Sequence, residues 1–204
     1  VRFRDNFELL GSPIGDATFC TEFMTSFVKK RVNHTLEALL LVRNAQAFHY
    51  LARLCCSICK VIHLLRSVPP LFCHDALHFF DSSLRKCVSL GLGVILPESE
   101  WKQATLPTSL GGLGFRSASR HAAGAYLASV SKAAACDGLE VSSACGWSEA
   151  VSESLCHANL ASLPEKVSQH TFSMACDKQT LAECLVEASC RPLGYLMSRV
   201  SGLF

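Results

Sequence analysis

The sequence predicts a mainly α-helical protein, and three observations support this fold class. Apolar residues recur at helical spacing through most of the first 133 residues. Helix caps and proline or glycine breaks separate these periodic segments. Alternation typical of a strand is confined to the first 15 residues. We therefore expect a single strand and turn at 1–15, a helical bundle at 16–133 and a smaller helical region at 134–204.

Residues 44–70 predict the helix around which the bundle is organised. Asn44 is a plausible N-cap, and Pro69 and Pro70 end the pattern because proline lacks a backbone donor. Projected at about 100° per residue, a broad apolar arc predicts burial on most sides. The arc consists of Tyr50, Leu51, Leu54, Ile58, Val61, Ile62 and Leu65.

A narrow polar stripe remains on this helix, and it carries cations but no acids. The stripe consists of Gln46, His49, Arg53, Ser57 and Lys60. Two interpretations stay open: a solvated face of an ordinary bundle helix, or a surface that contacts the phosphates of a nucleic acid.

The N-terminal part is expected to lead from a strand into helices. Residues 1–15 alternate apolar and polar residues before a turn, and we expect the sheet partners of this strand to lie upstream. Asp16 is expected to cap a helix whose end carries Lys29, Lys30 and Arg31, where cations suit either the helix C-terminus or phosphate contact. The apolar phase slips near His34, so residues 36–42 form either a kinked continuation or a second helix.

Glycine and proline separate the helices expected downstream. In the bundle these helices are 74–90, 97–107 and 117–135. The Gly111–Gly114 run is predicted to be a turn that links helices, because no Gly-Lys-Ser/Thr follows as in a phosphate-binding loop. A shift to small residues at 136–146 marks the expected boundary. Beyond it we expect short helices at 147–162, 164–175 and 178–190, and a tail after Pro192 that is poorly ordered or cut short.

Charge is distributed unevenly along the chain. Residues 1–133 carry fifteen Lys and Arg against nine Asp and Glu, a net charge of +6. Residues 134–204 carry four against eight, a net charge of −4. A polyanionic partner is therefore expected to meet the first part.

The twelve cysteines are interpreted as reduced thiols of an intracellular protein, because no secretory signal precedes them. Cys20, Cys55, Cys59 and Cys87 fall on apolar helix faces, where cysteine acts as a small hydrophobe. Cys56 and Cys59 lie inside the expected central helix, so no zinc finger is predicted, and nothing selects a catalytic cysteine. No run of about 18 residues is apolar enough to suggest a membrane span. The chain begins with Val1 and is interpreted as a fragment.

Histidines and carboxylates also occur together in the helix expected at 74–90. His74, Asp75 and His78 have helical spacing, and Asp81 follows them. Without a third carboxylate for a metal, we interpret all four as surface residues.

Four segments of the chain occur in a distinctive order. They are FELLGSPIGD, a helix ending in LLRSVPP, FDSSLRKCV, and WKQATLPTSLGGLGFRSASRHAAGAYLAS. Together they resemble the region after the catalytic palm in reverse transcriptases of non-LTR retrotransposons and related mobile elements. In that family a Leu-Gly strand closes the palm, a helical thumb follows, and a Leu-Pro…Gly-Gly-Leu-Gly segment comes next. Here Leu10-Gly11 and Ile14-Gly15 match the strand, residues 17–66 the thumb, and Leu106-Pro107 with Leu110–Gly114 the last segment, so the resemblance covers about residues 7–130.

The resemblance implies a thumb and connector that bind the backbone of an RNA/DNA duplex without catalysis. The family's palm holds two divalent metals on paired aspartates, and no Asp-Asp pair occurs in this chain. The chain is therefore expected to be inactive alone and to hold no cofactor, while the parent polymerase uses Mg²⁺. Its expected partners are the duplex and the missing palm and fingers of the same polypeptide, with no membrane. The residues expected to contact phosphates are His49, Arg53 and Lys60 first, then Lys29, Lys30, Arg31 and Arg66.

Two other classes of function remain open. One is a stand-alone helical module for protein–protein interaction with no nucleic-acid role. The other is a cysteine-rich metal protein, which would retain stoichiometric zinc in a reducing buffer.

Overall fold

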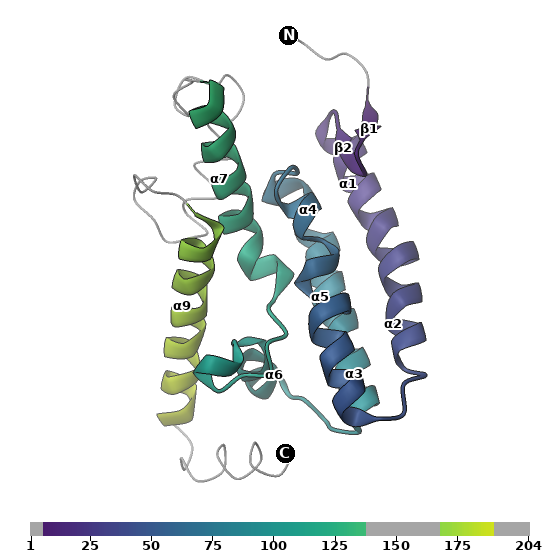
Figure 1. The fold of residues 1–204 in the computed structure, drawn as a ribbon, viewed down its shortest axis with the longest axis vertical. Coiled ribbons are helices and arrows are strands. Elements are labelled where there is room, and N and C mark those ends of the chain that lie inside the picture. The colour runs from purple at the N-terminus through teal and green to yellow at the C-terminus, as the bar shows by residue number, and fades with distance from the viewer. Residues whose placement is uncertain (1–5, 138–167, 190–204) are drawn as a thin grey trace.

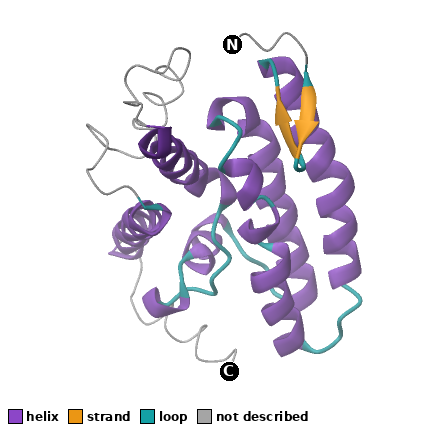
Figure 2. Cartoon of the chain, turned by 45° about the horizontal axis from the view of Figure 1, so that its top comes forward, coloured by secondary structure: helices purple, strands orange, loops and turns teal. Residues whose placement is uncertain are grey.

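The structure is a computed structural model that describes residues 6–137 and 168–189, and it is mainly α-helical, as the sequence predicts. Figures 1 and 2 show the first helices of the chain as roughly parallel columns, with one small hairpin beside the first of them, and Figure 2 shows the last two long helices inclined to these columns. The long helix α5 (Pro70–Leu92) is central, because helices α1, α2 and α3 and helix α7 all contact it.

The expected single strand is in fact a hairpin. Strand β1 (Phe7–Leu9) pairs antiparallel with β2 (Ser12–Ile14), with Phe7 opposite Ile14. Leu10 and Gly11 form the turn with positive φ angles of 50° and 80°. The prediction that the sheet partners lie upstream is therefore wrong for these strands: the chain supplies the partner strand itself, through the Leu10-Gly11 turn.

The first helical column is continuous through the expected phase slip. Helix α1 (Ala17–Phe27) begins at Asp16, whose carboxylate accepts the Phe19 N–H at 2.8 Å. A π-helical turn, η1 (Val28–Val32), joins it to α2 (Asn33–Leu39). The wider turn shifts the apolar phase, so Val28, Val32 and Leu36 all stay buried. The continuation is thus the correct one of the two alternatives.

The expected central helix is broken. Asn44 caps α3 (Ala45–Leu51) as predicted, through the Ala47 N–H at 2.9 Å. The chain continues as a π-helical turn η2 (Ala52–Cys56), a 3₁₀ turn η3 (Ile58–Lys60) and a short α4 (Ile62–Leu65). Ser57 between η2 and η3 has extended backbone, with φ −81° and ψ −154°.

The break changes which side chains of this segment face the core. Phe48, Ala52 and Cys56, four residues apart, are buried. Tyr50 and Leu54, expected in the buried arc, are 61% and 44% exposed. Ser57, expected on the open stripe, is buried. The predicted apolar arc is therefore wrong for the first half of the segment and right for Val61 and Leu65, which are buried.

Helix α5 begins four residues earlier than expected, with Pro70 in its first turn. Proline is tolerated there because a backbone N–H in the first turn has no acceptor within the helix. It ends at Gly93, whose φ of 67° is left-handed. Its buried side chains include Leu77, Phe80 and Leu84, which belong to the main apolar core.

Helices α6 (Glu98–Thr105) and α7 (Ala118–Asp137) lie close to their expected ranges. Between them a 3₁₀ turn, η4 (Thr108–Leu110), leads into the Gly111–Gly114 run. This run is a helix-linking turn, as predicted. We call residues 111–114 the Gly loop.

Helix α9 (Gln169–Ser189) packs against α7 and α6, on the side of α7 away from the first column. The prediction of two short helices at 164–175 and 178–190 is wrong over residues 169–189, because α9 runs unbroken through this range. The expected helix at 147–162, most of the 136–146 boundary and the tail after Pro192 lie outside the described residues.

By length and composition alone, the stretch Ala45–Leu65 is long and apolar enough to cross a membrane, so the prediction that no run of about 18 residues meets this test is wrong. Buried core helices pass the same test, so this finding is weak evidence for a span. Here Phe48, Ala52, Leu64 and Leu65 from this stretch are part of the buried core.

Candidate nucleic-acid interface

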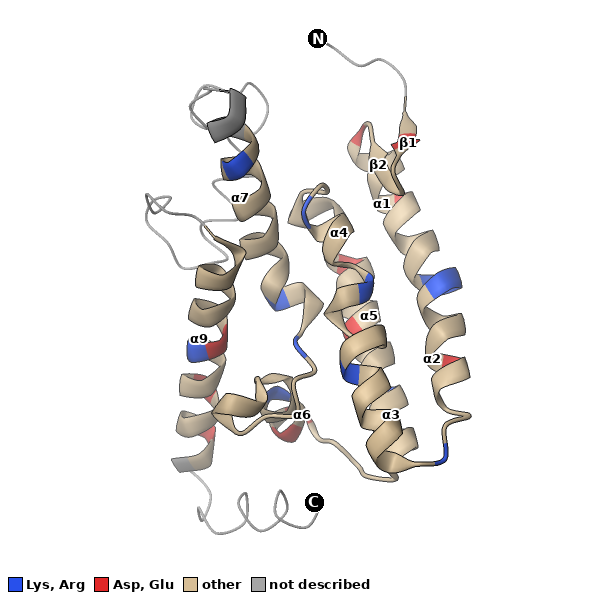
Figure 3. Cartoon of the chain, viewed as in Figure 1, with Lys and Arg blue, Asp and Glu red and all other residues tan. Residues whose placement is uncertain are grey.

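Cations are concentrated in one part of the bundle. Between residues 28 and 69, a range that we call the basic segment, seven Lys and Arg stand against a single acid, Glu37. The segment covers η1, α2 and the broken stretch from α3 to α4. Figure 3 shows Lys and Arg on both of these columns, and α2 contacts η2 between them. A local excess of this size creates a positive field that attracts polyanions.

His49 attaches α3 to the Gly loop. Its Nε2 lies 3.0 Å from the Leu113 carbonyl oxygen. Its ring also meets Phe115 edge to face, with centroids 5.3 Å apart, and Phe115 stacks on Trp101 at 6.0 Å. The first of the predicted contact residues is therefore a half-buried link between α3 and the loop, with its Nε2 already engaged.

The Gly loop needs glycine where it approaches other backbone and the basic segment. A Cβ at Gly112 would lie 2.0 Å from the Leu106 carbonyl oxygen. Gly114, with φ of 80°, donates its N–H to Leu106 at 2.8 Å, and a Cβ there would lie 2.7 Å from Arg53 Cδ. The loop thus packs directly on the aliphatic part of Arg53.

Arg53 and Lys60 keep their charged ends free of acids. Both side chains are half-buried. Among the described residues, no carboxylate forms an ion pair with either one. Arg53 and Lys60, which are among the residues first predicted to contact phosphates, therefore remain able to bind an external anion.

Lys29, Lys30 and Arg31 are exposed on the π-helical turn η1. The Arg31 guanidinium lies over the Phe27 ring, 5.7 Å from its centroid. The same ring meets His63 of α4 edge to face at 5.9 Å. These contacts place the three-cation turn near α4.

Arg66 behaves differently from the other predicted cations. Its Nε and Nη2 both donate to Gln169 Oε1, at 3.0 and 2.6 Å. It therefore ties the end of α4 to the start of α9. A neutral amide leaves its charge uncompensated.

Outside the basic segment, four cations are paired with carboxylates. Lys102 and Arg120 pair with Glu187 and Glu183 of α9, at 2.5 and 2.6 Å. Arg116 pairs with Asp177 at 2.8 Å, and Arg85 pairs with Glu98. The acidic C-terminal part thus neutralises cations of the second half of the bundle and leaves the basic segment unpaired. Sequence reasoning missed these pairs, because their partners lie up to 85 residues apart.

These pairs shift the pKa values of the α9 carboxylates. The hydrogen bond from Arg120 lowers the pKa of Glu183 below its usual range. Burial by itself raises the pKa of Asp177, but the close His121 ring and the Arg116 guanidinium outweigh burial and lower it. His121 Nε2 lies 3.3 Å from Asp177 Oδ1, while its Nδ1 lies 2.8 Å from the Ser117 carbonyl oxygen.

Asp81 is buried, and the interpretation of it as a surface residue is wrong. Its carboxylate accepts the backbone N–H groups of Ala118 and Ser119 at 2.8 and 3.1 Å. It also accepts the hydroxyls of Ser117 and Ser119 at 2.6 and 2.7 Å. Asp81 of α5 therefore caps the start of α7, a role usually filled by a residue of the same helix. His74, Asp75 and His78 are exposed, as expected.

The eight cysteines whose side chains are described are all free thiols. Cys20 and Cys87 are buried as expected, but Cys55 in the π-helical turn η2 and Cys59 after the break at Ser57 are exposed. The Cys56–Cys59 pair therefore does not lie inside an intact helix. Burial raises the pKa of Cys73 to about 12 and that of Cys87 to about 11, so neither thiol is activated. Within residues 6–137 and 168–189, no three His, Cys, Asp or Glu side chains form a metal-binding group.

Comparisons with protein-family models, curated proteins and solved structures found no match to this chain.

Proposed function

We propose that the chain is the non-catalytic thumb and connector of a retroelement RNA-directed DNA polymerase, and that its basic segment binds the primer–template backbone. The observation that carries the proposal is the division of the cations. Those of the basic segment form no ion pair with a carboxylate in the described parts of the chain, whereas Arg85, Lys102, Arg116 and Arg120 each have one.

Unpaired Lys and Arg on a rigid helical surface suit contacts to phosphates, which position a duplex without reading its sequence. Arg53 and Lys60 are held by the α3–α4 column, and Lys29, Lys30 and Arg31 extend the charge onto η1. The Gly loop, which is part of one of the four segments in the family resemblance, packs on this surface through His49 and Arg53. The loop thus supports the shape of the proposed interface.

Catalysis is not part of the proposal. Metal-assisted nucleotide transfer needs paired carboxylates to hold two ions, and the sequence has no adjacent aspartates. Palm and fingers of the same polypeptide would supply them, together with Mg²⁺.

The test measures duplex affinity and its salt dependence. Arg53→Gln with Lys60→Gln removes two charges and retains much of the aliphatic stem that packs on Gly114. A labelled RNA–DNA hybrid is titrated by fluorescence anisotropy at several salt concentrations. We expect the affinity at low salt to fall about tenfold or more. The slope of log affinity against log salt should decrease by roughly 2, since each phosphate contact contributes about 0.9.

The matched control removes two exposed cations outside the basic segment, Lys86→Gln with Lys178→Gln. It has the same change in net charge and should alter affinity and slope far less. Equal effects of both variants would show that binding depends only on net charge. Unchanged binding in the first variant would refute the assigned contacts.

A second candidate function is a helical module for protein–protein interaction. It is favoured by exposed apolar side chains on the α3–η2 surface, at Tyr50, Leu51 and Leu54. Absence of duplex binding even at low salt would favour this candidate.

A further inference from the structure

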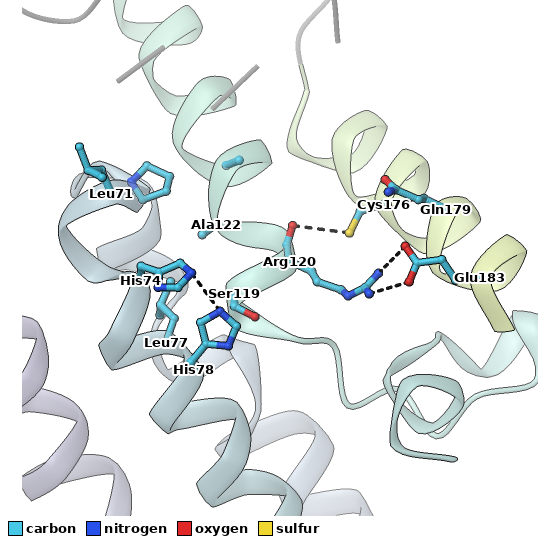
Figure 4. Close-up of a pocket in the computed structure, with 12 residues that line it drawn as sticks. Leu71, His74, Leu77, His78, Ser119, Arg120, Ala122, Cys176, Gln179 and Glu183 are labelled. Atoms are coloured by element: carbon cyan, nitrogen blue, oxygen red, sulfur yellow. Dashed lines mark hydrogen bonds and ion pairs between the residues drawn. The ribbon is translucent and has the colours of Figure 1, made fainter. Parts of the chain in front are cut away.

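Two histidines of α5 stand one helical turn apart with their ring nitrogens together. His74 Nε2 lies 3.2 Å from His78 Nε2, and the ring centroids are 4.4 Å apart. Figure 4 shows the two rings pointing toward each other beside the cavity between α5, α7 and α9. Neither residue belongs to the basic segment.

The neighbouring carboxylate favours a bare nitrogen at this point. Asp75 Oδ1 lies 3.1 Å from His74 Nδ1. When Nδ1–H donates to that carboxylate, the neutral ring has no proton on Nε2, and its lone pair faces His78. A carboxylate behind a ring nitrogen is also the arrangement that orients metal-binding histidines in proteins.

The spacing of the two nitrogens fits one metal ion. Zinc binds histidine nitrogens at about 2.0–2.1 Å in tetrahedral geometry, which places two ligand nitrogens about 3.3 Å apart. The observed separation is 3.2 Å. We propose that His74 and His78 form a binding site for a divalent first-row transition ion, zinc first of all. Asp75 acts as the positioning residue.

The cavity leaves the other coordination positions of the ion open. Its volume is about 360 Å³, enough for several water molecules. Two possible ligands on its α9 side are already engaged. The Cys176 thiol donates to the Arg120 carbonyl oxygen at 3.5 Å, and Glu183 accepts from the Arg120 guanidinium. The ion would therefore have two protein ligands and bind water or a small external ligand at the remaining positions.

The experiment uses Co²⁺ as a coloured substitute for zinc, on the full chain in a reducing buffer free of chelators. Optical titration is carried out on the wild type, His74→Gln, His78→Gln and the double variant, with Zn²⁺ as competitor. His34→Gln on α2 is the matched control, because it also replaces an exposed histidine of a helix. Circular dichroism shows that each variant retains its helices.

We expect one site per chain that each single substitution at His74 or His78 weakens at least tenfold, while His34→Gln leaves it unchanged. Cysteine ligation would add a strong thiolate-to-cobalt charge-transfer band, and binding that shows this band and survives the double variant overturns the proposal. So does absence of binding at millimolar Co²⁺.

Discussion

The two sides of α5 differ in how much polar interactions add to apolar packing. On one side α1, η1, α2 and α3 pack on it, and the buried cluster is made of apolar groups such as Met24, Val28 and Phe48. On the other side the same apolar core continues through Ala118, Ala122 and Ala125 of α7, and polar contacts are added to it. Asp81 caps α7, and ion pairs hold α9 on α6, on α7 and on the segment between them. We expect the first side to be destabilised by substitutions that remove side-chain volume. We expect the second side to be destabilised by changes of pH and by substitutions that remove a charge.

The largest expected effect is on the apolar side. Phe80 is fully buried, and Phe80→Ala should lower the free energy of unfolding by about 3–5 kcal/mol, because it removes apolar contacts and leaves a cavity. Phe79→Ala is the neighbouring control: that side chain is 41% exposed, and we expect a loss below about 1 kcal/mol. Urea unfolding followed by circular dichroism measures both. Similar losses would contradict the assigned burial.

Removing the Asp81 cap tests the junction between the two sides. Asp81→Ala leaves two backbone N–H groups and two hydroxyls without their acceptor, and we expect a loss of about 2–3 kcal/mol. Asp75→Ala removes an exposed acid from the same helix and should change stability by less than about 0.5 kcal/mol. Hydrogen exchange should locate the loss of protection at the start of α7. A uniform loss along α7 would argue against a capping role.

Acid should release α9 before it affects α5. Asp177 and Glu183 both have a lowered pKa in the folded state. Their stabilisation is complete above the unfolded carboxyl pKa of about 4 and is lost as the pH falls through the lower folded values. Hydrogen exchange between pH 5 and pH 2 should show α9 amides losing protection first. Asp177→Asn should weaken protection of α9 already at pH 7. Simultaneous loss in α9 and α5 would contradict the division.

The smallest effect is expected for an exposed ion pair. Glu98 pairs with Arg85 but is 71% exposed, so Glu98→Gln should cost less than about 1 kcal/mol. Asp177→Asn likewise replaces a paired carboxylate by an amide, but at a buried site, and should lower the free energy of unfolding more. Equal losses of unfolding free energy in urea would show that burial does not make one ion pair more stabilising than the other.

Local signals in the sequence were sufficient for the helical fold class and for two helix caps. Asp16 and Asn44 cap as expected, and the Gly loop links helices. The break at Ser57 could not be predicted, because apolar residues at helical spacing continue past it. The π-helical turn before it changes which side chains face the core, and periodicity assumes a constant turn.

The candidate interface was predictable only in part. The absence of acids near Arg53 and Lys60 is visible in the sequence, but the Gly loop that covers Arg53 is about 60 residues away in the chain, where no local pattern points to it. The engagement of Arg66 with Gln169, 103 residues away, is equally invisible. Whether the exposed cations bind a duplex stays a prediction.

The cap that Asp81 provides has a consequence for the order of folding. The amides of α7 that it accepts belong to residues 37 and 38 positions later in the chain. Ser117 supplies a local cap, since its Oγ accepts the Arg120 N–H at 3.2 Å. The two N–H groups that Asp81 accepts gain their acceptor only when a loop of that length has closed and α5 is already formed. We expect α7 to consolidate after α5, so Asp81→Ala should accelerate unfolding and leave the refolding rate nearly unchanged. A refolding rate that falls in proportion to stability would instead place this contact in the folding nucleus.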